Sequence, residues 1–185
     1  MYTFSHVPFV FGQPFILEAI NAAKLGLDAP IVSGAVTATM MLVSVATSWF
    51  APTLQQRFGV GRVFLIALGM QVGLIGLLAL TNHPAAIALL FLRMVPDSLA
   101  RPYILARIHP QLSDTARATY LSLQSFCGRL LFATTLYLSS LAATTGSALA
   151  YPEIQSILMG YAAAGALLFA ALVIIARRAQ LKFEP

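Results

Sequence analysis

Long apolar blocks are the feature that most constrains this chain. Its 185 residues are 59% hydrophobic and 9% charged, whereas about 25% of the residues in a soluble domain are charged. Each block has roughly 20 residues, the length of helix that crosses about 30 Å of hydrocarbon. We therefore expect an all-α integral membrane protein, one domain over residues 1–185, with membrane lipid as its solvent. The predicted spans lie near residues 3–24, 30–51, 63–81, 85–106, 117–142 and 154–176.

Charge and cysteine content exclude several classes of protein. The net charge is +5, but the eleven Lys and Arg are scattered among apolar segments, so we expect no nucleic-acid partner. The single cysteine, Cys127, excludes an internal disulfide and a thiolate metal cluster. His6, His83 and His109 sit at or near predicted helix ends without the spacing of a metal site. We expect no metal, no other cofactor and no enzymatic activity.

Positive charge lies mainly on one side of the predicted spans. The other side carries only Lys24. The positive-inside rule then places both termini in the cytoplasm and predicts a multi-pass protein of a cytoplasmic membrane. An even number of spans agrees with this topology. The basic residues of the cytoplasmic side are Arg57, Arg62, Arg107, Arg117, Arg177, Arg178 and Lys182.

Two proline-containing segments resemble each other. Pro8 and Pro14 in the first predicted span have the same spacing as Pro96 and Pro102 in the fourth. A helix interrupted by proline should be buried in protein or line a wet cavity, and paired interrupted helices point to a transporter binding site. With ten prolines in the chain, coincidence is an equal alternative. A true repeat would make the domain two inverted three-helix units.

The fourth predicted span carries three charged residues. Arg93, Asp97 and Arg101 recur every four residues and so form one stripe, in which neighbours could pair. Asp97 lies about 18 Å from the outer end of the span, near the middle of the membrane. It is therefore the candidate coupling site for a proton or cation. The alternatives are a helix that neutralises its own charges and, for Arg101, a side chain that reaches towards the cytoplasm.

Four further polar residues are candidates for a substrate or ion pathway. Arg129 lies near the middle of the fifth span and needs an acidic partner or an anionic ligand. Glu18 and Asn21 share one face of the first span, and Gln13 lies on another. For Glu18 a structural ion pair is an equal alternative.

Residues 92–131 resemble helices ten and eleven of the major facilitator superfamily, and the Arg-Ala-Thr-x-x-Ser run at residues 117–122 is the most telling part. The stretch PTLQQRFGVGR resembles the cytoplasmic loop motif of that family, Gly-x3-Asp-Arg-x-Gly-Arg-Arg. Gln56 and Pro52 stand where the family has an acid and its first glycine. The residues assigned to this loop motif are Arg57, Gly59 and Arg62.

This resemblance covers essentially the whole chain, as the C-terminal half of such a transporter, helices seven to twelve. It implies that spans one and four line a central cavity, that two and five face a second six-helix half, and that three and six face lipid. It also implies transport of a small solute, by proton or cation coupling or by facilitated diffusion. The chain would then be a fragment of a longer transporter, or it would pair with a second six-helix half. That half would be provided by a second copy of the same chain or by a separate chain. The alternative is a membrane scaffold without transport activity, or a non-functional truncated transporter.

Overall fold

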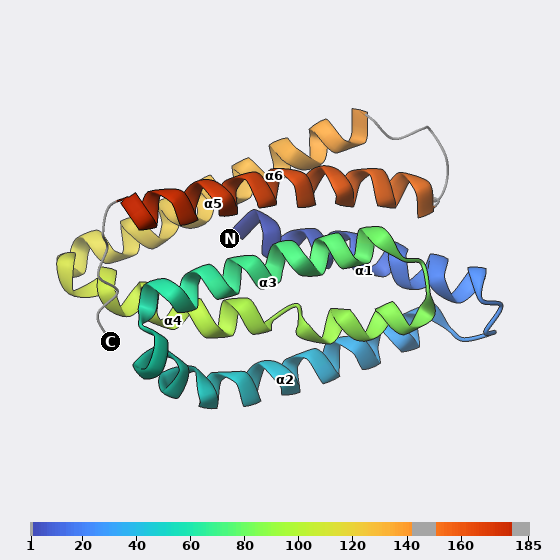
Figure 1. Ribbon diagram of the computed structural model, residues 1–185, viewed down its shortest axis with the longest axis horizontal. Coiled ribbons are helices and arrows are strands. Elements are labelled where there is room, and N and C mark those ends of the chain that lie inside the picture. Colours follow the sequence, from blue (N-terminus) through green and yellow to red (C-terminus); the bar gives the residue numbers. More distant parts are fainter. Residues whose placement is uncertain (1, 142–150, 179–185) are drawn as a thin grey trace.

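The computed structural model describes residues 2–141 and 151–178, and these residues are helical apart from short connections. The long helices lie side by side in a bundle (Figure 1). Two 3₁₀ helices, η1 and η2, accompany the α-helices. The elements are α1 (Tyr2–Ala22), α2 (Ala29–Phe58), α3 (Val60–Leu80), η1 (Pro84–Leu92), α4 (Val95–Ile108), η2 (His109–Gln111), α5 (Asp114–Leu141) and α6 (Tyr151–Arg178).

Three of the described helices, α2, α3 and α6, are long and apolar enough to cross a membrane. This composition indicates a multi-pass membrane protein. Among the described residues, α1, α4 and α5 do not have that combination of length and hydropathy. The fourth segment is divided into two short elements, and α5 carries several Ser, Thr and Arg residues. Six spans and an inverted repeat therefore stay predictions.

The chain turns sharply between α2 and α3. Helix α2 extends beyond residue 51, where the predicted span ends, and passes through Pro52 to Phe58. Gly59 follows with φ of 78°, a conformation that residues with a side chain rarely adopt. Its backbone N–H donates to the Gln55 carbonyl oxygen (2.7 Å). Most of the predicted connection over residues 52–62 is therefore helical.

The fourth predicted helix is broken in its middle, whereas the first is continuous. Helix η1 ends at Leu92 and α4 begins at Val95, and Figure 1 shows the irregular step before α4. Pro96 causes such a break because it has no N–H to donate and its ring crowds the carbonyl of Leu92. Helix α1 runs through both of its prolines. The two proline-containing segments thus differ in local structure.

Helix α1 contacts α2, α3, α5, α6 and η1, while one of its faces, which includes Phe9 and Leu17, is exposed. Three of its phenylalanines, Phe4, Phe11 and Phe15, are buried in the main apolar core. The same core contains buried residues of α3 and α6, such as Ile75 and Leu158. Helix α1 therefore contributes one face to the main apolar core.

Helices α3 and α6 approach each other closely. Gly165 of α6 is buried against Val72 and Phe4, with no room for a side chain. The Tyr151 hydroxyl donates to the Ala79 carbonyl oxygen (3.1 Å) at the other end of this contact. Small residues allow such close packing between helices in a membrane, where apolar burial alone does not drive association.

Candidate functional site

A polar cavity of about 370 Å³ lies between α1, α4 and α5. It begins immediately after the break that precedes α4. Charged and polar residues share its lining with aliphatic ones, which sets it apart from the apolar core around α1. The lining residues are Tyr2, Ser5, His6, Asp97, Arg101, Ile104, Leu105, Leu121, Gln124 and Ser125.

Asp97 is held at this cavity by a residue of α3. The side-chain amide of Gln71 donates from Nε2 to Asp97 Oδ1 (3.2 Å). Gln71 is only 2% exposed, and its Oε1 has no hydrogen-bond partner among the described residues. Burying an amide whose oxygen has no hydrogen-bond partner costs folding free energy. The bundle nevertheless buries Gln71 at the position where it contacts Asp97. Gln71 was not among the site residues predicted from the sequence. Its place as a polar residue in the middle of the most apolar predicted span could have identified it as a candidate site residue.

Hydrogen bonds of Ser98 also fix the position of the first turn of α4. The hydroxyls of Ser98 and of Ser44 on α2 are 2.6 Å apart. Ser98 additionally donates from its hydroxyl to the Met94 carbonyl oxygen (3.0 Å), which also accepts the Ser98 backbone N–H (3.0 Å). These bonds connect α4 to α2 while Gln71 connects it to α3. The start of α4 therefore has a defined position relative to two other helices.

The charged stripe of the fourth segment is not a chain of ion pairs. Within residues 2–141 and 151–178, no ion pair joins Arg93, Asp97 and Arg101. The Arg93 Nε instead donates to Met40 Sδ (3.2 Å), and its guanidinium lies 4.9 Å from the centre of the Phe9 ring. The expected pairing of Arg93 with Asp97 requires a continuous helix. Because the helix breaks between them, Arg93 lies between α1 and α2 and forms no ion pair with Asp97, although the charge of Asp97 still acts on it.

His6 lines the cavity, although the sequence indicated only that it lies near the end of a predicted helix. Its ring stacks on Tyr2 with ring centres 4.1 Å apart. Its Nδ1 is 2.9 Å from the Tyr2 carbonyl oxygen, and because a carbonyl only accepts, this distance assigns the proton to Nδ1. Nε2 is then left as an acceptor. The sequence held no signal that would place this side chain opposite α4.

Five of the seven predicted pathway residues, namely Gln13, Glu18, Asn21, Arg93 and Arg129, lie outside the cavity lining. Glu18 is half-buried on α1, while Asn21 and Arg129 are exposed. None of these three side chains forms a hydrogen bond or ion pair within the described part of the chain. The described residues therefore provide no acidic partner for Arg129.

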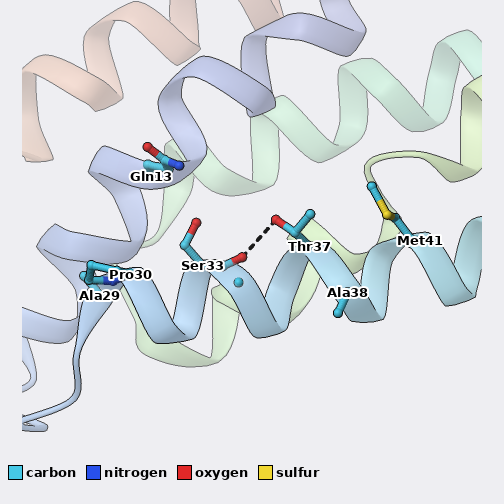
Figure 2. A pocket seen from close by; sticks show the side chains of 8 residues that line it. Gln13, Ala29, Pro30, Ser33, Thr37, Ala38 and Met41 are labelled. Carbon is cyan, nitrogen blue, oxygen red and sulfur yellow. Dashed lines mark hydrogen bonds between the residues drawn. The ribbon is translucent and has the colours of Figure 1, made fainter.

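Gln13 lines a second, more open space between α1 and the start of α2. Figure 2 shows this groove of about 630 Å³, with Gln13 on one helix and Ser33 and Thr37 on the other. The Thr37 hydroxyl donates to the Ser33 carbonyl oxygen (2.9 Å), within α2 itself. No charged side chain lines this groove in the described residues. Gln13 also borders the small space that holds Arg93.

The residues assigned to the loop motif cluster where α2 meets α3. Arg57 and Arg62 are exposed, and Gly59 makes the turn between the two helices. The Arg57 guanidinium lies 5.8 Å from the centre of the Phe58 ring. None of the three lines the polar cavity.

The cavity offers hydrogen bonds and charge but not the ligands of a metal cluster. No group of three His, Cys, Asp or Glu side chains comes together in the part of the chain that the structure describes. The protein is thus defined as an all-helical chain with three candidate membrane-spanning helices and a polar cavity beside a broken helix. No family model matches this sequence, and neither does any curated protein or solved structure.

Proposed function

We propose that this chain is one half of a secondary transporter of the major facilitator type, which moves a small solute across a cytoplasmic membrane. The observation that carries the proposal is the polar cavity beside the break before α4. Irregular backbone at membrane depth is tolerated only where it is buried in protein or lines a wet cavity. In transporters, broken helices of this kind surround the binding site.

Asp97 is the residue assigned to proton or cation coupling. It lines the cavity, and only one of its carboxylate oxygens is engaged, by Gln71. Its other oxygen is therefore available to a proton, a cation or a solute. Ionisable residues inside membrane helices generally mark such pathways because their burial is costly.

The partner in this proposal is a second six-helix half. Helices α2 and α5 expose large apolar side chains, including Leu42, Trp49, Phe126 and Leu131. A half-bundle cannot enclose a solute, so these faces would pack against a second copy or a separate chain. Light scattering of the detergent-solubilised protein should give a protein mass near twice the 19.8 kDa chain. A stable monomer would contradict assembly from two copies of this chain.

Transport itself is tested with the full chain in proteoliposomes. We expect uptake of at least one solute from a panel of ¹⁴C-labelled amino acids, sugars and organic acids. Asp97→Asn should lower that uptake at least about tenfold, since charge-assisted hydrogen bonds contribute about 1.5–3 kcal/mol. Arg107→Gln is the matched control, because Arg107 is exposed on the same helix and does not line the cavity. Uptake that is indifferent to Asp97→Asn, or no uptake by an assembled particle, would favour the scaffold alternative.

A further inference from the structure

Two opposite charges share one wall of the cavity without neutralising each other. Asp97 and Arg101 both line it from α4, one helical turn apart. Side chains at this spacing can meet on a helix surface, yet no ion pair joins them in the described residues. Asp97 Oδ2 and the Arg101 guanidinium also have no hydrogen-bond partner there. The wall therefore presents a carboxylate with one unbonded oxygen next to an unpaired guanidinium, while Gln71 and the charge of Arg93 act on Asp97 from outside the cavity lining.

The opposite parts of the cavity are neutral. Ser5 and His6 of α1, and Gln124 and Ser125 of α5, provide hydrogen-bonding groups without a formal charge when His6 is neutral. Ile104, Leu105 and Leu121 form an aliphatic part of the lining. A volume of about 370 Å³ is within the range of about 300–1,000 Å³ for small-molecule sites.

We infer that the cavity binds a small zwitterion with an aliphatic side chain, namely an aliphatic α-amino acid. The ammonium of such a ligand would lie at Asp97, its carboxylate at Arg101, and its side chain against the aliphatic residues. This inference rests on the proposed function, whose solute class it names. A ligand with a single charge would make only one of the two charge-assisted contacts, which lowers its affinity.

Titration calorimetry of the detergent-solubilised full chain tests the inference with three matched probes. L-leucine carries both charges, 4-methylpentanoate lacks the ammonium, and 3-methylbutylamine lacks the carboxylate. We expect L-leucine to bind at least about tenfold more tightly than either analogue, because each analogue loses one charge-assisted contact. Equal affinity for the three probes, or no binding of L-leucine, would overturn the inference.

Two variants assign each charge of the ligand to its residue. Asp97→Asn should lower the affinity for L-leucine about tenfold or more. It should not lower the affinity for 4-methylpentanoate, because that probe has no ammonium to contact Asp97. Arg101→Gln should weaken L-leucine binding and leave 3-methylbutylamine binding no weaker. Arg107→Gln, exposed on the same helix, should change neither affinity. A thermal unfolding scan of each variant separates lost binding from lost structure, and the three probes on the unmodified chain do not depend on any variant.

The proposed function and this inference can fail separately. If L-leucine binds with the expected charge dependence but ¹⁴C-leucine does not enter proteoliposomes, the site assignment stands and transport is contradicted. If another solute of the panel is taken up while L-leucine does not bind, transport stands and the zwitterion site is overturned.

Discussion

A Gln71→Glu variant is expected to lose about 3–5 kcal/mol of stability, the usual cost of an uncompensated buried charge. Gln71 is 2% exposed, and its Nε2 donates to Asp97 Oδ1 at 3.2 Å. The substitution keeps the shape of the side chain but places a second carboxylate against the first. Thermal unfolding in detergent, followed by circular dichroism at neutral pH, measures the loss.

Two further variants show whether charge is the cause. Gln71→Leu removes the hydrogen bond to the Asp97 carboxylate without adding charge, so it should cost at most about 1.5–3 kcal/mol, partly offset by the loss of the unpartnered Oε1, and less than Gln71→Glu. The double variant Gln71→Glu with Asp97→Asn restores one carboxylate and one amide at the two positions. It should recover most of the stability, since residues in direct contact are energetically coupled. Equal losses in the single and double variants would contradict the importance of this contact.

Gly165→Ala is expected to destabilise the contact between α3 and α6 by about 1–3 kcal/mol, the range for overpacking of a dense interior. The added Cβ would lie 2.7 Å from Val72 Cγ2 and 2.9 Å from Phe4 Cε1. Neither neighbour can yield easily, because valine is stiff at χ1 and Phe4 belongs to the buried core. The unfolding midpoint should fall by roughly 2–4 °C for each kcal/mol lost, as in domains of this size.

Gly160→Ala is the matched control for this prediction. Gly160 lies on the same helix, but no atom is within 4 Å of the Cβ that alanine would add. Because alanine favours a helix over glycine by up to about 1 kcal/mol, the control should be neutral or slightly stabilising. Val72→Ala in the Gly165→Ala background should recover part of the loss by removing the closest contact. A control as damaging as Gly165→Ala would mean that steric overlap is not the reason.

Hydropathy and proline pattern predicted much of the local structure. The apolar blocks correspond to helices throughout the described residues, and the ends of α1 and α3 lie within three residues of the predicted spans. Proline predicted an interruption in the fourth segment, which is present, but also one in α1, which is absent. Helices α1, α2 and α4 all continue through a proline, so proline alone does not locate a break, and packing around the turn contributes to the outcome. That packing is not visible in the local sequence.

The candidate site could be predicted only in part. Asp97 and Arg101 stood out because charged residues are rare in apolar segments, and both line the cavity. Arg129 stood out for the same reason but lies outside it. The difference between them depends on which face of each helix meets a neighbour, and a single charged residue in an apolar helix carries no information about that direction.

Length, hydropathy and charge in the sequence are sufficient to predict an all-helical chain with helices that can cross a membrane, because the spanning length depends only on the rise per residue and the apolar thickness. Which helices pack against one another depends on more than length, hydropathy and charge. Lipid and protein interior are about equally apolar, so hydropathy cannot distinguish the face that meets a helix from the face that meets lipid. The contact of Gln71 with Asp97, the position of His6 in the cavity and the fit of Gly165 against Val72 therefore follow from tertiary packing alone.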